Sequence, residues 1–372
     1  MHEAMGVIFS NIYDDSFGDL TKHRTVASLP FGSRYRQIDF VLSNMSNSGI
    51  KNIGLITKYN YRSLMDHLGT CDEWDLNRKN AGLTLLPPFV SGNTGVYKGK
   101  LEALYSAVNY LETANFETVV LSDTTVLCNL DYQPIIEEHL QSGADVTALA
   151  TLETLPGKRH EALVLRADRD LFAKEVLVDK APLPGEYLGM GMFVIGRKLL
   201  LEIIRDAHSK GQAHLEREFL QTRFNRGELK IGIAPVGGVV LRNRDLPSFF
   251  QNNMALLKKE VRDGLFFADR PVYTKVRDET PTYYGEESNV KECLVADGCE
   301  IRGTAEKSVL FRGVKIEQGA KVKNSIIMQG SHIGAGAELE CVILDKDVAV
   351  SPGARLVGTP EHTVIVNKGE TV

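Results

Sequence analysis

Short apolar segments alternate with segments of helical periodicity along the first two-thirds of the chain. The apolar segments predict strands at residues 5–9, 52–57, 118–122, 145–150 and 192–195. Amphipathic helices are predicted between them, at residues 40–48, 101–112, 133–142 and 197–207. This alternation favours a Rossmann-like α/β domain, with a mostly parallel sheet covered by helices on both faces. Ligands of such sheets bind beyond the carboxyl ends of the strands, so we expect the site in the loops after Phe9, Thr57 and Ser122.

The pattern changes after about residue 281. From residue 290 to 358 aliphatic residues recur at intervals of six, as in Ile327, Ile333 and Leu339, with glycines and other small residues between them. This repeat is typical of a left-handed parallel β-helix with three short strands per coil, and an irregular β-sandwich is the alternative. A helix is predicted at 251–263. The predicted domains are residues 1–265 and 285–372, joined by an extended linker at 266–284.

Composition narrows the class of protein. The 43 Lys and Arg residues against 48 Asp and Glu residues give a net charge of −5, which argues against a large nucleic-acid footprint. We see neither an apolar run long enough to span a membrane nor a signal peptide at the N-terminus, so we expect a cytoplasmic protein that binds no membrane. The cysteines are scattered without CxxC spacing, which predicts free thiols; they are Cys71, Cys128, Cys293, Cys299 and Cys341.

The turn after the first strand has an unexpected composition. Nucleotide-binding enzymes usually place glycines there, so that backbone N–H groups can approach a phosphate. Residues 11–17 read Asn-Ile-Tyr-Asp-Asp-Ser-Phe, with no glycine and with two carboxylates, Asp14 and Asp15. Negative charge repels a triphosphate. The turn is therefore not a phosphate-binding loop, although a solvated acidic turn is an equally simple interpretation of the two carboxylates.

Residues 31–60, FGSRYRQIDFVLSNMSNSGIKNIGLITKYN, resemble the motif GGKYRxIDFxLSNxxNSGIxxIxVxTQY of glucose-1-phosphate adenylyltransferases. Further similar segments follow in the family's order: YKGKLEAL at 97–104, VDKA at 178–181, GMGMFVI at 189–195, SVLFRGVKI at 308–316 and SIIMQGSHIG at 325–334. The resemblance covers nearly the whole chain. It implies a GT-A-like nucleotidyltransferase domain followed by a left-handed β-helix of hexapeptide repeats.

The family reaction joins ATP and glucose 1-phosphate to give ADP-glucose and pyrophosphate, with Mg²⁺ offsetting the phosphate charge. Registered on the family's motifs, the glycine-rich loop falls on the acidic turn, its pyrophosphate-binding Arg on Ser16 and the following Lys on Val26. The metal-binding Asp matches Asp123, which Thr124 follows, and a second metal-binding Asp falls on Arg242 or Asn243, depending on register. The resemblance therefore implies that no catalytic residue and no metal site is intact.

The sugar-phosphate side is less altered. Lys180 matches the family's sugar-phosphate Lys, although an ordinary surface lysine is the alternative. In the motif that begins at Tyr97, Lys100-Leu101-Glu102 replaces the family's Thr-Ala-Asp. The residues that could form a vestigial sugar-phosphate site are Tyr97, Gly99, Asp179, Lys180 and Gly189.

The resemblance is closest to the second, non-catalytic type of subunit in bacterial glycogen synthesis. It implies a regulatory subunit that enhances a catalytic partner in a heterotetramer, or forms a homo-oligomer alone; Mg²⁺ and ATP would belong to the partner and no cofactor would be intrinsic. Effector contacts could involve Arg24, Arg34 or Arg242. The alternatives are an active adenylyltransferase with an altered loop, and a β-helix acyltransferase or scaffold, for which His332 and His362 would be the catalytic candidates.

Overall fold

A computed structural model describes residues 2–10, 12, 14–79, 81–87, 97–153 and 162–372. The chain divides into two compact units. The first unit comprises Met1–Ile12, Val41–Tyr61 and Leu68–Val240, and the second comprises Tyr13–Phe40, Arg62–His67 and Leu241–Val372. The domain boundaries predicted from the sequence stay predictions. Among the described residues, no helix is both long and apolar enough to cross a membrane.

The first unit is built on a mixed sheet whose main strand order is β10-β9-β11-β6-β1-β4-β5, with β8 and β12 joined to it through β11. Strands β6, β1 and β4 run parallel, as predicted, and so does β5, which was not predicted. Strand β11 is antiparallel to β6, β8 and β9. The strands are β1 (Ala4–Phe9), β4 (Asn52–Ile56), β5 (Gly82–Leu86), β6 (Thr118–Asp123), β8 (Val146–Leu152), β9 (Leu163–Ala167), β10 (Ala173–Val178), β11 (Tyr187–Gly196) and β12 (Ile231–Pro235).

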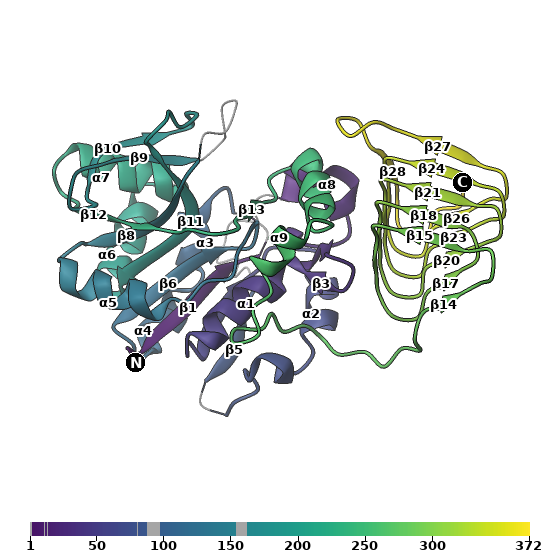
Figure 1. Ribbon diagram of the computed structural model, residues 1–372. Helices are drawn as coiled ribbons and strands as arrows, with labels where there is room; N and C mark the ends of the chain where they lie inside the picture. The colour runs from purple at the N-terminus through teal and green to yellow at the C-terminus, as the bar shows by residue number, and fades with distance from the viewer. Residues whose placement is uncertain (1, 11, 13, 80, 88–96, 154–161) are drawn as a thin grey trace. The chain divides into compact units, whose positions relative to one another are not determined.

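Helices cover both faces of this sheet (Figure 1). On one face, α3 (Lys100–Tyr105), α4 (Val108–Thr113) and α6 (Arg197–Ser209) share an apolar core with alternate residues of β1 and β6. Gly6, which points to the opposite face, lies against Met45 of α1 (Gln37–Asn47), where a Cβ would meet the sulfur at 2.5 Å. The helix predicted at 101–112 is divided between α3 and α4. The remaining elements are α5 (Gln133–Ser142), α7 (Thr222–Asn225), a π-helical segment (Leu215–Gln221), a 3-10 turn (Asp72–Trp74) and the short strand β7 (Val126–Leu127).

The second unit begins with two 3-10 segments, Asp14–Thr21 and Val26–Ser28, followed by the hairpin of β2 (Pro30–Phe31) and β3 (Tyr35–Arg36). Aromatic rings hold this part of the unit together: the ring of Tyr35 stacks on that of Phe266 with centroids 5.1 Å apart. The helix predicted at 251–263 is instead two helices, α8 and α9, and the first begins earlier, where Asp245 caps it. The bounds are α2 (Arg62–Leu68), α8 (Leu246–Ala255), α9 (Lys259–Asp263) and β13 (Leu241–Arg242).

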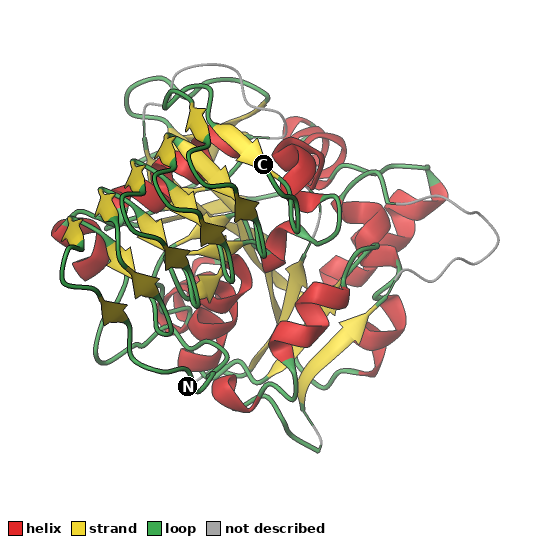
Figure 2. Cartoon of the chain, turned by 90° about the vertical axis from the view of Figure 1, so that its right-hand side faces the viewer, coloured by secondary structure: helices red, strands yellow, loops and turns green. Residues whose placement is uncertain are grey.

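The C-terminal part of the second unit is a parallel β-helix of three five-stranded sheets, seen as stacked rows of short arrows in Figure 2. One sheet contains β14 (Tyr283–Tyr284), β17 (Glu300–Ile301), β20 (Lys315–Ile316), β23 (His332–Ile333) and β26 (Ala349–Val350). The second contains β15 (Asn289–Lys291), β18 (Thr304–Glu306), β21 (Lys321–Lys323), β24 (Glu338–Glu340) and β27 (Arg355–Val357). The third contains β16 (Leu294–Val295), β19 (Val309–Leu310), β22 (Ile326–Ile327), β25 (Val342–Leu344) and β28 (Val364–Val366).

The coil length explains why the six-residue repeat is imperfect. Ile316, Ile333 and Val350 pair in register on one sheet, so each of these coils is 17 residues long. The shorter side lies between the second and third sheets, where the chain turns through a residue with positive φ that is not glycine, such as Asn324 at 45°. The buried aliphatic residues of successive coils fill the interior in a single cluster. The predicted α/β domain followed by a hexapeptide β-helix is therefore confirmed.

Candidate functional site

The acidic turn after β1 is built into the second unit. The side chain of Asp14 is buried, and its Oδ1 accepts a hydrogen bond of 2.8 Å from the backbone N–H of Val26. Asp15 and Ser16 are exposed. The solvated-turn interpretation is therefore wrong for Asp14, whose carboxylate holds the 3-10 segment Val26–Ser28 in place. Asn11 and Tyr13 lie outside the described residues.

A buried lysine contacts two buried carboxylates in the first unit. Asp123 ends β6, and Glu216 lies in the π-helical segment Leu215–Gln221. The ammonium of Lys100, the first residue of α3, donates to Asp123 Oδ2 at 3.0 Å and to Glu216 Oε1. Each of the three residues is at most 3% exposed. Charged groups this deeply buried need partners of opposite charge, and the one ammonium lies between the two carboxylates; we call the three residues the lysine–carboxylate cluster.

Two glycines allow the backbone to pack closely around the lysine–carboxylate cluster. A Cβ at Gly191, where φ is +69°, would lie 1.9 Å from Asp123 Oδ2, and a Cβ at Gly99 would lie 2.3 Å from the carbonyl oxygen of Ala213. Aromatic rings add to the stabilisation of the ammonium, because Lys100 Nζ is 5.9 Å from the ring centroid of Phe9 and 6.0 Å from that of another phenylalanine on β11.

The cluster does not fit a divalent cation. Asp123, the residue that matches the family's metal-binding Asp, faces an ammonium, and a second positive charge beside Lys100 would be repelled. Nowhere in the described part of the chain do three or more His, Cys, Asp or Glu side chains gather as a metal site. The carboxylates of Asp123 and Glu216 therefore already have a cationic partner, the ammonium of Lys100.

The other positions matched to catalytic residues have structural partners. Thr124 is buried, and its hydroxyl donates to the carbonyl of Phe9 at 3.3 Å. In the second unit, Asn243 is fully buried and donates to the Gln37 side chain at 3.2 Å. Arg242 is buried beside it on β13, and its carbonyl accepts a hydrogen bond from the Asn252 side chain at 3.0 Å. Neither register puts a carboxylate in the second metal position.

The residues matched to a sugar-phosphate site are all in the first unit. Lys180 is exposed two residues after the end of β10, and the neighbouring Asp179 forms a salt bridge with Arg217. Gly189 lies against Leu163, since a Cβ there would be 3.1 Å from the Leu163 Cβ. Tyr97 is half-buried, and burial raises the pKa of its hydroxyl. The vestigial sugar-phosphate site stays a prediction.

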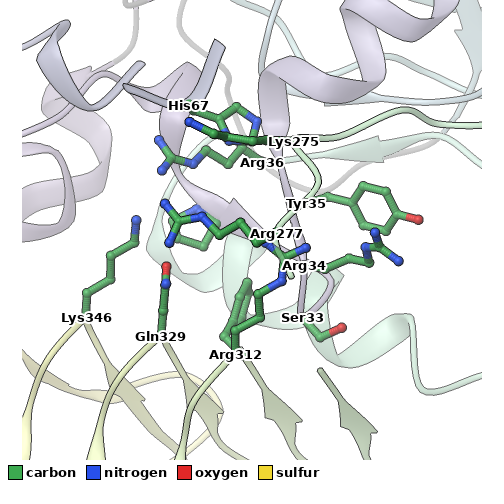
Figure 3. Close-up of a pocket in the computed structure, with 12 residues that line it drawn as sticks. Ser33, Arg34, Tyr35, Arg36, His67, Lys275, Arg277, Arg312, Gln329 and Lys346 are labelled. Atoms are coloured by element: carbon green, nitrogen blue, oxygen red, sulfur yellow. The ribbon is translucent and has the colours of Figure 1, made fainter. Parts of the chain in front are cut away.

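The second unit contains a pocket lined by basic side chains, which we call the basic pocket (Figure 3). Its cationic side chains come from the β3 hairpin, from the extended segment after α9 and from the β-helix, and the hollow lies between them. The described residues that line it include no acid. They are Pro30, Ser33, Arg34, Tyr35, Arg36, His67, Lys275, Arg277, Phe311, Arg312, Gln329 and Lys346.

The repeat of the β-helix builds one wall of the basic pocket. Arg312, Gln329 and Lys346 are 17 residues apart, so they occupy the same corner of three successive coils and rise side by side in Figure 3. The opposite wall is held by short polar contacts: the Arg36 guanidinium donates to the Ser63 carbonyl at 2.6 Å, and His67 contacts buried Asp39 at 2.5 Å. The β-helix therefore positions one wall of the pocket, and side-chain hydrogen bonds position the other.

The basic pocket carries positive charge that is poorly compensated. Burial and the positive charges of Arg36 and Arg24 together lower the pKa of Lys346 to about 7. Burial also lowers the pKa of Arg36 to about 10, although Asp39 opposes this shift. The pKa of Arg312 is lowered by burial and by two neighbouring guanidinium groups. An anion in the pocket would relieve this repulsion and would raise these pKa values.

Sequence reasoning placed Arg34 among possible effector contacts, and it lines the basic pocket. Arg24 instead forms a buried salt bridge with Asp345 at 2.5 Å, and Arg242 is not among the lining residues. The roles of Lys100 and Glu216 were missed. The sequence did contain an indication of the role of Lys100. This lysine places a cation where the family has a Thr, and the family's metal-binding Asp matches Asp123. The β-helix wall of the basic pocket could also have been found in the sequence, because Arg312, Gln329 and Lys346 are 17 residues apart. A search for a strict six-residue repeat does not detect this spacing.

Both parts of the chain match known protein families. Residues 16–232 match the nucleotidyl transferase family, and residues 278–363 match the GlmU-like C-terminal hexapeptide family. The glycogen biosynthesis protein GlgD of Geobacillus stearothermophilus is 38% identical over 99% of this chain and 97% of its own length. GlgD of Bacillus subtilis is 32% identical over 99% and 96%. The glucose-1-phosphate adenylyltransferase of Bacillus mycoides is 30% identical over 93% of this chain and 92% of its own.

These relatives are similar over nearly the full length of the chain, across both the nucleotidyltransferase fold and the β-helix. Lys100, Asp123 and Glu216 of the lysine–carboxylate cluster lie within the segment that matches the nucleotidyl transferase family. The chain therefore belongs to the family of nucleotidyltransferases that comprises GlgD and the glucose-1-phosphate adenylyltransferases.

Proposed function

We propose that this chain is a regulatory, catalytically degenerate subunit of glucose-1-phosphate adenylyltransferase that assembles with the catalytic subunit and enhances its activity. The names of the relatives, glycogen biosynthesis protein GlgD among them, support a role in glycogen biosynthesis. Mg²⁺ and ATP would be bound by the catalytic partner. A heterotetramer is the expected assembly, and a homo-oligomer is expected when the chain is alone.

The lysine–carboxylate cluster is the observation that carries this proposal. Nucleotidyl transfer needs a divalent cation and donors aimed at the phosphates, because negative charge develops on the oxygens as pyrophosphate leaves. Here Asp123 is neutralised by Lys100, and Asp14 puts a carboxylate in the turn where phosphate would bind. An active enzyme would have to replace the metal site and the phosphate loop together. We therefore favour the non-catalytic role over the active alternative.

Assembly is supported by the exposed end of the β-helix. Among the described strands, β14 pairs only with β17, and β15 and β16 end their sheets in the same way. Tyr283 and Tyr284 on β14 are about half exposed, at 55% and 50%. Exposed edge strands with large side chains are surfaces on which a second chain can pair. A catalytic subunit with its own β-helix is the partner that this end suits best.

Regulation is supported by the basic pocket. Its buried guanidinium groups and Lys346 present several donors to one hollow, which is the arrangement that recognises phosphate groups. We expect the pocket to bind a small phosphorylated or otherwise anionic effector. The binding free energy would come partly from relieving the repulsion that lowers the pKa of Lys346 and Arg36.

The proposed function is tested by pyrophosphate release from ATP and glucose 1-phosphate with Mg²⁺. We expect little turnover from the purified chain, and a higher rate from the catalytic subunit of the same organism when this chain is added. Size-exclusion chromatography with light scattering should show a mixed oligomer at the same time. Turnover by the chain alone at the rate of the catalytic subunit would refute the proposal, as would a mixture that shows neither assembly nor enhancement.

The effector role needs a separate measurement on the purified chain. Inorganic phosphate and sulfate should raise the melting temperature, because ligands that bind only the folded state stabilise it. Arg312→Gln should reduce this shift, whereas Arg355→Gln, on an exposed strand of the same β-helix, should leave it unchanged. An equal shift in both variants would show that the anions act elsewhere.

A further inference from the structure

The ammonium of Lys100 lies between the carboxylates of Asp123 and Glu216. We propose that the ammonium of Lys100 holds the place of a divalent cation between Asp123 and Glu216, and that a latent metal site appears when this ammonium is removed. The inference adds to the proposed function. The two can fail separately, because metal binding is measured on the isolated chain and enhancement on the mixture with its partner.

The geometry of the two carboxylates supports a cation between them. Oδ2 of Asp123 and Oε1 of Glu216 both contact the one Nζ atom, so their oxygens converge on a single point. Mg²⁺ and Mn²⁺ are commonly bound by one or two carboxylates together with water. Once the competing ammonium has gone, two convergent carboxylates would supply the protein ligands of such a site, and water would complete the coordination.

Burial explains why some cation is required there. Asp123 and Glu216 are both 3% exposed, and two close carboxylates without a counter-charge would repel each other strongly. The chain supplies the counter-charge from α3, one residue after Gly99, whose lack of a side chain lets α3 begin against the backbone of Ala213. The ammonium thus satisfies an electrostatic need that a bound metal would otherwise meet.

The ammonium also makes metal binding unfavourable in the natural chain. A divalent cation at the convergence point would have to displace a side chain that is 1% exposed and whose Nζ lies near the ring of Phe9. The displaced Lys100 side chain would either stay buried without its carboxylate partners or have to disrupt the packing of α3 to reach solvent. We therefore expect the natural chain to have no divalent-cation affinity at this position.

The test compares Mn²⁺ binding by the natural full-length chain with binding by its Lys100→Thr variant. Binding is measured from the loss of the electron paramagnetic resonance signal of free Mn²⁺. The natural chain should show no Mn²⁺ binding that depends on Asp123, whereas the variant should bind one equivalent of Mn²⁺. Lys98→Thr, which removes an exposed lysine two residues away, should behave like the natural chain. The double variant Lys100→Thr/Asp123→Asn should lose the new site.

A second variant and a second measurement test whether a failure to bind Mn²⁺ is due to misfolding. Lys100→Gln keeps most of the side-chain volume and supplies an amide oxygen, so it should also gain Mn²⁺ binding, and Mn²⁺ should raise its melting temperature but not that of the natural chain. The inference is overturned if neither Lys100 variant binds Mn²⁺ more tightly than the natural chain. It is also overturned if the natural chain binds Mn²⁺ in a manner that Asp123→Asn abolishes.

Discussion

Replacing Lys346 in the basic pocket should make the protein more stable, because the folded state holds its positive charge in a partly buried position. Lys346 has a pKa of about 7 instead of its ordinary 10.5, chiefly because it is buried. The charged groups that face it are Arg36, Arg24 and Lys368, which lower its pKa, and Asp345, which raises it. The folded protein therefore holds this proton less tightly than the unfolded chain does. Lys346→Met keeps a similar length and removes the charge.

The magnitude follows from the pKa difference. The folded-state pKa of Lys346 lies below the unfolded value, so the unfolded chain binds more protons between pH 7 and 10.5 and stability rises with pH in that window. At about 1.4 kcal/mol per pKa unit, the full penalty below pH 7 is at most about 5 kcal/mol. About 2 kcal/mol of it should be relieved between pH 7 and pH 9. The Lys346→Met variant should lack this component.

The assay is reversible urea unfolding of both proteins at pH 6, 7, 8 and 9, without phosphate or sulfate. The variant should be the more stable protein at pH 7, and its advantage should shrink toward pH 9. Lys291→Met, at an exposed lysine of the same β-helix, should show no such advantage. A constant advantage across this range, or a variant less stable than the natural chain at pH 7, would refute the electrostatic reasoning.

Three further predictions concern the rest of the chain, and the first two are measured by urea unfolding. Arg24→Met should cost about 3–5 kcal/mol because it leaves Asp345 buried without its partner, and a double variant with Asp345→Leu should cost less; equal costs would contradict the pairing. Asp14→Ala should cost about 1–3 kcal/mol by removing the acceptor for the Val26 N–H, whereas Asp14→Asn keeps an acceptor and should cost less. Restoring the family's glycines and arginine in residues 11–17 should not restore pyrophosphate release, because Lys100 still neutralises Asp123; full activity would show that the loop alone was limiting.

Local patterns were enough to predict most elements of the first unit. Helix α5 occupies the range predicted for it, and strands β1, β4 and β6 match their predicted ranges to within one residue. Apolar periodicity reports which face of a segment is buried, and that is a local property. Where α3 ends and α4 begins, the periodicity continues through the break, so the sequence predicted one helix.

Strand direction was harder to predict. Strand β11 lies between β6 and β8 and runs antiparallel to both, although its apolar sequence resembles that of a buried parallel strand. A strand that is covered on both faces looks the same in either direction. The β-helix was easier because each coil contacts its neighbours in the chain, so that its repeat appears directly in the sequence.

The sequence by itself determined the family frame, the order of the two folds and the loss of the glycine-rich loop, because each of these is carried by consecutive residues. Only the tertiary structure decided that Lys100 meets Asp123 and Glu216, and that basic side chains from the β3 hairpin and the β-helix share one pocket. These contacts join residues far apart in the chain. Their existence depends on how elements pack, and their charge balance depends on burial, which no single segment reveals.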